Sequence, residues 1–260
     1  TPTATCWPAS TVARGHSVAD SYAGRLGETL RARGVSAESF NLSLPGFGAR
    51  RKHLVLEQAL RFQPSLVILH VNDSNEYEDE REWRRREEFQ GWHPKNWLMK
   101  SLALRRLYEM KQERIFWEWL PSAIRQQRAA SDADAHLQAA LDGDKVRTWS
   151  RLVREQTTAD AALVQRQGVK LLLLAHATAD LEQANPVTDD HGLAALCESL
   201  RAGDVAVVSL KSLFAGQDPR KVFSEGSHFR AAGQQLVAEA LAGTLAEAGW
   251  LPPQVPKARR

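Results

Sequence analysis

Apolar and polar residues follow two periods along the chain, one typical of helices and one typical of buried strands. Apolar residues recur at Tyr22, Leu26 and Leu30, which predicts an amphipathic helix over residues 20–33 that stops at Gly34. Short continuous apolar runs predict strands that are buried on both faces of a sheet. Such strands are expected near residues 3–8, 37–42, 66–71, 169–175 and 204–210.

Helical patterns lie between the expected strands. They cover residues 48–62, 147–167 and 191–201, and a long Ala/Leu pattern follows Gly233. Strands that alternate with helices predict an α/β protein, in which helices cover both faces of a parallel sheet of about five strands. We expect a single domain over residues 1–260. In such sheets, reactive groups gather on loops at the carboxyl ends of the strands.

Composition supports a globular protein with an ample core. The 260 residues are 43% hydrophobic and 25% charged with both signs interspersed, which excludes bulk disorder. Much of the formal net charge of +3 comes from residues 257–260, which we interpret as a solvated end, so we expect no nucleic-acid partner. Cys6 and Cys197 lack metal-ligand spacing and are expected to be buried thiols rather than a disulfide.

Targeting and cofactor motifs narrow the class of protein further. No run approaches the roughly 20 apolar residues that span a bilayer, so we expect no membrane span in this chain. The chain starts at Thr1 without a methionine, which leaves open a cytoplasmic protein or an extracytoplasmic one that has lost an N-terminal segment. HExxH, CxxC, P-loop and GxGxxG motifs are absent, so we expect neither a metal nor another cofactor.

An acid and a histidine near the C-terminus are candidates for a catalytic acid–base pair. Glu225 precedes His228 by three residues, on a loop that leads into the last helical pattern. A carboxylate that turns back onto an imidazole can hold one ring nitrogen protonated and leave the other free as a general base. Such a base requires a nucleophile and groups that stabilise the product.

A polar pair and a glycine turn follow two of the expected strands. The strand at 66–71 runs into Asn72 and Asp73, and the strand at 38–44 runs into a turn that contains Gly46. A glycine N–H and an asparagine amide can supply two donors for the oxyanion that develops in acyl transfer. Their joint order with the downstream acid and histidine favours a catalytic site over separate turn residues.

These motifs resemble the sequence blocks of the SGNH (GDSL-type) hydrolases, esterases and lipases with a flavodoxin-like three-layer sandwich. The matching residues are Asn41 and Gly46 of the second block, His70, Asn72 and Asp73 of the third, and Glu225 and His228 of the last. The third block has a histidine where the family has glycine, and the last has glutamate where the family has aspartate. The resemblance covers about residues 9–75 and 160–248. It implies metal-free hydrolysis or transfer of O-acyl groups by a serine nucleophile.

The first family block, where the nucleophile should lie, is degenerate. Residues 3–11 are compatible with a strand but contain no Gly-Asp before a serine. The family's usual distance back from the aromatic residue of the first helix, here Tyr22, implies Ser10 as the nucleophile. A register shifted by one residue would put Ala9 there and leave an inactive protein, whereas Ser17 lies too close to Tyr22.

The resemblance implies a role for each matched residue. If Ser10 is the nucleophile, His228 takes its proton and Glu225 orients the resulting imidazolium. Gly46, Asn72 and the Ser10 N–H would then form the oxyanion hole. The departures from the family pattern leave a second hypothesis open, a catalytically inactive protein of the same fold that binds glycans or a protein partner.

A tryptophan-rich segment follows the third block. Between Asp73 and Asp134 it contains five of the eight tryptophans of the chain. We predict a helical insertion at about 77–135 that caps the site and contacts a small ester or an acylated carbohydrate. The candidate contact residues are Trp83, Trp92 and Trp97. Packing within the insertion's own core is the other interpretation.

We predict no catalytic role for two further sets of polar residues, an acidic run and the remaining histidines. The acidic run at 76–80 is interpreted as a solvated helix face rather than a metal site. Histidines such as His53 and His176 show no spacing that indicates a partner. The sequence does not identify the acyl group, the alcohol or the oligomeric state.

Overall fold

The structure, a computed structural model, describes most of the chain, but not residues 8–17 or most of the tryptophan-rich segment. Contacts group the chain into two units, residues 1–76 with 150–260 and residues 77–149. Only the backbone is described at residues 3–7 and at Val18, Asp189 and Glu225. The described residues are 3–7, 18–35, 37–42, 46–73, 76–77, 79–80, 83, 101, 142–181, 187–189, 192–225 and 227–251.

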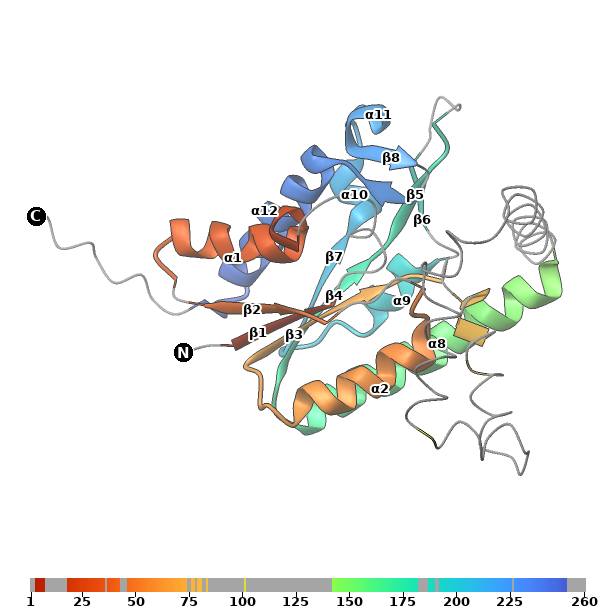
Figure 1. Cartoon of the computed structure of the whole chain (residues 1–260), viewed down its shortest axis with the longest axis horizontal. Helices are drawn as coiled ribbons and strands as arrows, with labels where there is room; N and C mark the ends of the chain where they lie inside the picture. The colour runs from red at the N-terminus through yellow and green to blue at the C-terminus, as the bar shows by residue number, and fades with distance from the viewer. Residues whose placement is uncertain are drawn as a thin grey trace, which may run out of the picture. The chain divides into compact units, whose positions relative to one another are not determined.

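A five-stranded parallel sheet forms the centre of the first unit (Figure 1). Its strands are β1 (Thr3–Trp7), β2 (Glu38–Asn41), β3 (Leu66–Val71), β4 (Lys170–Ala175) and β7 (Val205–Ser209). The strand order is β2-β1-β3-β4-β7, which is the order of flavodoxin-like folds. The predicted α/β fold with a central parallel sheet is therefore confirmed.

Helices cover both faces of this sheet (Figure 1). The larger ones are α1 (Tyr22–Ala32), α2 (Ala49–Leu60), α8 (Gly143–Arg166), α9 (Leu193–Ser199) and α12 (Ala231–Glu247). Ser21 begins α1, because its hydroxyl accepts a hydrogen bond from the Gly24 N–H at 3.3 Å. Gly34 follows the helix in a left-handed conformation, with φ of 76°. The predicted helix over 20–33 is thus confirmed, with capping residues that explain its ends.

Short elements complete the first unit at the carboxyl side of the sheet. Two two-stranded antiparallel sheets pair β5 with β6 and β8 with β9. The short strands and helices are η2 (Val18–Asp20), β5 (Ala177–Ala179), β6 (Val187–Asp189), α10 (Leu210–Phe214), α11 (Pro219–Val222), β8 (Phe223–Glu225) and β9 (His228–Phe229).

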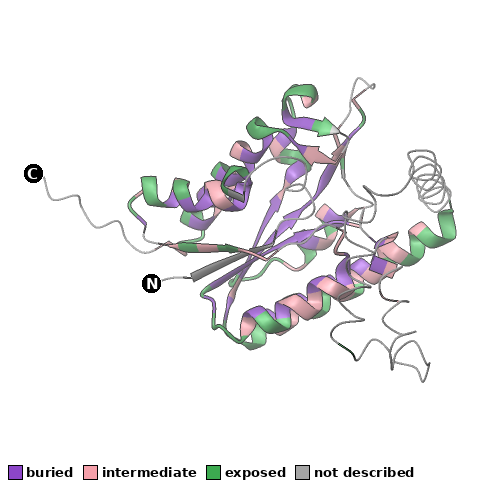
Figure 2. Ribbon diagram, viewed as in Figure 1, coloured by how far each residue is buried: buried purple, intermediate pink, exposed green. Residues whose placement is uncertain are grey.

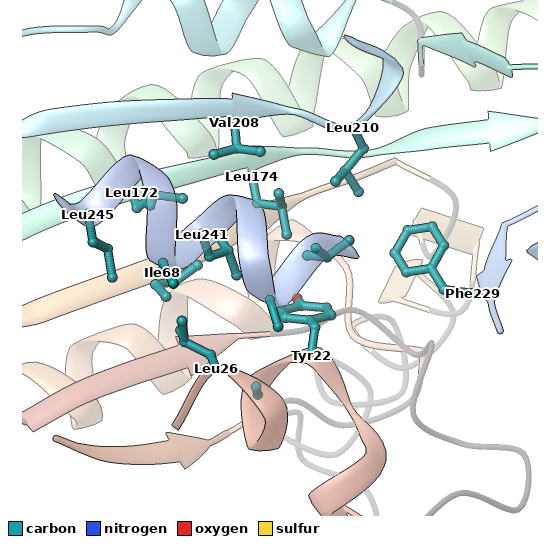
Figure 3. Close-up of a cluster of buried hydrophobic side chains, with 14 of the residues drawn as sticks. Tyr22, Leu26, Ile68, Leu172, Leu174, Val208, Leu210, Phe229, Leu241 and Leu245 are labelled. Atoms are coloured by element: carbon teal, nitrogen blue, oxygen red, sulfur yellow. The ribbon is translucent and has the colours of Figure 1, made fainter. Parts of the chain in front are cut away.

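Apolar side chains pack against the sheet in two clusters, one on each face. In Figure 2 the central strands β3 and β4 are buried along almost their whole length, whereas the helices expose their outer sides. Side chains from α1, α12 and the strands meet on one face (Figure 3): Tyr22, Leu26, Ile68, Leu172, Leu174, Val208, Leu241 and Leu245. The other face buries Leu56, Val67, Leu69, Val164, Leu171, Leu173 and Val207. Both faces must be covered, which explains the continuous apolar runs.

The register of β3 and β4 sets the position of the residues that follow them. Leu66 pairs with Lys170 and Val71 pairs with Ala175, so the two strands end level with each other. The ladder continues for one more bond, since the His176 N–H donates to the Val71 carbonyl at 2.9 Å. Asn72 and His176 are therefore neighbours at the carboxyl edge of the sheet.

The second unit contains the tryptophan-rich segment, and few of its residues are described. Trp83 is helical and half-buried, whereas Trp92 and Trp97 lie outside the described residues. The Trp149 indole donates to the Glu80 carboxylate at 3.0 Å, and its ring meets that of Tyr77 at 6.4 Å between centroids. The predicted lid at 77–135 remains a prediction. In the part of the chain that is described, no helix has the length and apolar content needed to cross a membrane.

Candidate active site

The hairpin of β8 and β9 carries the candidate acid and base. Glu225 and His228 are register partners, so their backbones lie opposite each other across the hairpin. His228 is half-buried, and the Ser227 hydroxyl lies 3.5 Å from its Nδ1. The Ser224 hydroxyl donates to the His228 carbonyl at 3.2 Å, which braces the turn. This backbone arrangement suits an acid that orients the histidine, a role that remains a prediction for Glu225.

Gly46 lies in the turn between β2 and α2. Its φ of 72° belongs to the left-handed region, which a glycine adopts without a Cβ clash. Its carbonyl accepts a hydrogen bond from the guanidinium of Arg51, which stacks 4.4 Å from the centre of the Phe47 ring. These contacts tie the turn to the first turn of α2. The oxyanion role of its N–H remains a prediction.

Asn72 is 2% exposed and is held by a lysine that sequence reasoning did not identify. Lys52 of α2 is itself only 8% exposed. Its ammonium donates to Asn72 Oδ1 and, at 3.2 Å, to the His70 carbonyl. A clue was present in the sequence, because Lys52 shares the helical face of Ala49 and Leu56, where an apolar residue would be expected.

The acidic run was interpreted wrongly as a solvated face. Glu76 and Asp79 are each 1% exposed. Glu76 Oε1 accepts a hydrogen bond from the Ala49 N–H at 2.7 Å, at the start of α2. The N-cap residue of that helix, Gly48, makes no side-chain capping bond, so a carboxylate from a distant segment takes that place. This bond connects the segment after Asn72 to the helix that follows the Gly46 turn.

A chain of three buried polar rings lies on the α1 and α12 face. The Tyr22 hydroxyl is 3.0 Å from His70 Nδ1, and His70 Nε2 is 2.9 Å from His176 Nδ1. The side chains are between 0% and 1% exposed. Among the described residues, His176 Nε2 has no hydrogen-bond partner. His70 occupies the position where the resembling family has glycine, and His176 was not expected to have a partner.

Burial makes both histidines neutral. Desolvation lowers the pKa of His70 well below its ordinary value, and electrostatic interactions with His176 and Lys52 lower it further. Desolvation also lowers the pKa of His176 to about 3, with smaller contributions from Lys52 and His228. Neutral imidazoles can share a hydrogen bond without a counter-charge, which explains how two of them are buried side by side.

His228 belongs to the same edge of the sheet as Asn72. The ring of His176 lies 5.6 Å from that of Phe229, the residue after His228. His176 in turn follows β4 directly beside the end of β3. The structure thus gathers Asn72, the Glu225–His228 hairpin and His176 at the carboxyl edge.

An ionic cluster lies on the opposite face, between α2 and α8. Asp160 is 2% exposed, and its Oδ1 lies 2.6 Å from His53 Nδ1 and 2.9 Å from Gln156 Nε2. Burial raises the pKa of Asp160, although the bonds from Gln156 and His53 oppose the shift. Asp160 lines a small pocket together with Lys52 and Asn72. His53 therefore has a partner that its sequence spacing did not indicate.

The strand that precedes the candidate nucleophile is described, whereas the nucleophile itself is not. Ser10 lies outside the described residues, as do Ala9 and Ser17. The backbone of β1 ends at Trp7, and this strand lies between β2 and β3 in the sheet. Within the described residues, no group of three or more histidine, cysteine or acidic side chains is arranged to hold a metal ion.

Several solved ester hydrolases share this fold at low sequence identity. A lipase/acylhydrolase from Enterococcus faecalis matches with a TM-score of 0.56 and 14% identity, over 98% of this chain and 100% of its own. An esterase from Pseudoalteromonas sp., inhibited by monoethylphosphonate, matches with a TM-score of 0.53 and 11% identity, over 95% and 98%. An acetyl xylan esterase matches with a TM-score of 0.52 and 12% identity, over 92% and 98%. No family model and no curated protein matches the sequence.

The solved ester hydrolases that match this chain indicate which fold it has. At these identities they show the fold alone, which this chain shares with a lipase/acylhydrolase and an esterase. The resemblance predicted from the sequence motifs is therefore confirmed at the level of the fold.

Proposed function

We propose that the protein hydrolyses or transfers O-acyl groups of carboxylic esters, with a serine nucleophile and without a metal. One observation carries the proposal: Asn72 and the hairpin that pairs Glu225 with His228 gather at the carboxyl edge of a flavodoxin-like sheet. That edge is where such folds bind and convert ligands. The fold shared with ester hydrolases supports the same reaction class.

The proposed mechanism uses five residues. Ser10 attacks the ester carbonyl while His228 accepts its proton, and His228 then protonates the departing alcohol. Glu225 orients the imidazolium and stabilises its charge. Gly46 and Asn72 donate to the oxyanion, and loss of one such donor typically lowers kcat by ~10²–10³-fold.

The proposed substrate is an acetyl or other small acyl ester, in which the alcohol is a carbohydrate. An acetyl xylan esterase among the proteins of similar fold supports this class. The tryptophans of the insertion supply flat apolar surfaces of the kind that bind sugar rings. Trp83, Trp92 and Trp97 are the proposed contacts.

The nucleophile is tested by labelling and turnover. We expect the protein to hydrolyse p-nitrophenyl acetate and to form one covalent adduct with a serine-reactive phosphonate, found by mass spectrometry in the peptide that contains Ser10. Ser10→Ala should abolish both, with thermal stability nearly unchanged, whereas the control Ser17→Ala should keep both. A labelled Ser17 would contradict the proposed register. A folded wild-type protein with neither label nor turnover would support the inactive glycan- or protein-binding alternative.

The lid is tested by comparing a large and a small substrate. Replacing Trp83, Trp92 and Trp97 by alanine should raise KM for acetylated xylan oligosaccharides several-fold, because apolar contact area is lost. The KM for p-nitrophenyl acetate should change little, because so small an ester needs no lid contact. Trp250→Ala serves as a matched control, since that half-buried ring packs on Lys170 at the start of β4. Equal effects on both substrates would count against a lid.

A further inference from the structure

The buried ammonium of Lys52 requires a physical explanation. A lysine is rarely buried, because removing its charge from water is costly unless partners replace the lost hydration. Here the ammonium has two acceptors on one short segment, the His70 carbonyl at 3.2 Å and Asn72 Oδ1. Both belong to the end of β3, where the proposed oxyanion hole lies. The lysine is therefore directed at the residue whose amide the proposed reaction uses.

Lys52 also determines which way the Asn72 amide faces. A lysine ammonium has only donors, whereas an asparagine amide has an acceptor oxygen and a donor nitrogen. The flipped amide would set its NH₂ group against the ammonium, donor against donor. Oδ1 therefore faces Lys52, and Nδ2 is directed away from it. An oxyanion hole needs an N–H donor, which is the group this arrangement presents.

We propose that Lys52 is a positioning residue for the reaction, which fixes the Asn72 amide with Nδ2 toward the oxyanion and polarises it. This inference rests on the proposed ester chemistry. A cation on Oδ1 draws electron density from the amide, so the N–H becomes a stronger donor. Because Lys52 and Asn72 are both buried, water screens this effect little.

The surroundings of Lys52 offer another explanation for its burial, which involves no role in the reaction. Asp160 of α8 lines the same pocket, and the charge of Lys52 acts on it. A lysine that served only to neutralise this carboxylate would also be buried there. The two explanations differ in what happens when both charges are removed together.

The first test is kinetic, with p-nitrophenyl acetate as the substrate. Lys52→Met should lower kcat on the order of 10- to 100-fold while KM changes little, because the amide contributes mainly in the transition state. Lys52→Arg, which keeps a cationic donor, should recover part of the loss. Lys170→Met is the matched control, since Lys170 is half-buried at the opposite end of β4. A folded Lys52→Met protein with kcat within about twofold of wild type would overturn the proposal.

Two double variants separate the explanations. Adding Lys52→Met to Asn72→Ala should lower kcat little further, because the lysine acts through the amide. Fully multiplicative losses would instead show that Lys52 acts independently of Asn72. The variant Lys52→Met/Asp160→Asn removes both buried charges and should fold even if the single variant does not. It should keep the kcat defect; recovery of wild-type kcat would show that the lysine only neutralises Asp160.

A spectroscopic measurement does not depend on turnover. The ¹H–¹⁵N resonances of the Asn72 side-chain amide should shift in Lys52→Met/Asp160→Asn, but not in Asp160→Asn or in Lys170→Met. An unchanged Asn72 amide would overturn the positioning role even in an active enzyme. Conversely, a wild-type protein without esterase activity would overturn the proposed function and the catalytic part of this inference, while the amide shift would still report the orientation.

Discussion

The two faces of the sheet bury polar groups in different ways. On the α1 and α12 face, Tyr22, His70 and His176 form a neutral hydrogen-bonded chain. On the α2 and α8 face, Lys52 and Asp160 are ionisable groups of opposite sign that line the same pocket. Neutral rings need only hydrogen bonds to be buried, whereas charged groups also need opposite charge nearby. The α1 and α12 face of the sheet therefore buries neutral polar groups, whereas the α2 and α8 face buries ionisable groups beside the candidate site.

The two faces should respond to pH with opposite signs. The pKa values of His70 and His176 are lowered, so their contribution to stability is complete above 6.5 and is lost as pH falls. The pKa of Asp160 is raised from 3.8, so its contribution is complete below that pH and is lost as pH rises through the folded-state pKa. A fall in pH should therefore destabilise the protein through His70 and His176 and should reduce the cost of burying Asp160.

The largest expected effect is the acid sensitivity of the histidine face. Between pH 7 and pH 4.5 the free energy of unfolding should fall on the order of 2–3 kcal/mol through His176 alone, because the unfolded chain binds a proton that the native ring does not. Urea unfolding across this range measures the slope. The variant Tyr22→Phe/His70→Leu/His176→Leu should lose most of it. A wild-type protein equally stable at both pH values would contradict neutral burial of these rings.

A smaller effect is expected when the hydrogen-bonded chain is cut at its tyrosine. Tyr22→Phe keeps the ring but removes the hydroxyl, which leaves His70 Nδ1 buried without that partner. The loss should be about 1–3 kcal/mol, as for other buried polar groups that lose a partner. Tyr77→Phe is the control, at a half-buried tyrosine of the second unit. Thermal unfolding of both variants at pH 7 compares them, and equal losses would show that the hydroxyl bond to His70 contributes nothing specific.

The smallest expected effect is the pH dependence of stability that arises from the buried Asp160, which should have the opposite sign to that of the histidines. Relative to Asp160→Asn, the wild-type protein should lose stability as pH rises from about 4 toward 7, because the buried carboxylate must ionise. Denaturant titrations of both proteins at three pH values measure the difference. The exposed Asp144, changed to asparagine, serves as the surface control. A wild-type protein that gains stability over Asp160→Asn on this rise would mean that attraction to Lys52 and His53 outweighs burial.

The sequence predicted the sheet because apolar runs determine it directly. The run at 66–71 had to be buried on both faces, and the helical periods before and after it placed it in a parallel sheet. The positions of Gly46 and Asn72 followed from the same reasoning, because both come just after strands. These are local properties of the chain, so periodicity is enough to find them.

The polar partners could not be found in this way, because they are not local. His70 and His176 are separated by 106 residues and meet only because β3 and β4 are adjacent in register. His53 of α2 and Asp160 of α8 are 107 residues apart in the sequence and meet only where the two helices come together. Glu76 was misread because an acidic run is usually solvated, whereas this carboxylate caps a helix in a distant part of the chain. Only Lys52, on an otherwise apolar helical face, gave a local indication of burial.

The bond between Glu76 and Ala49 has a consequence for how such proteins can be recombined. One boundary between the two units falls directly after Glu76, so this residue ends the first of the two segments that make up the sheet-containing unit. An exchange of the second unit between proteins of this fold should therefore place its upstream junction after residue 76 rather than at residue 73. A junction three residues earlier would remove the cap from α2 and would disturb the helix that carries Lys52. The hydrogen bond between Glu76 and the start of α2 therefore sets the upstream limit for such an exchange.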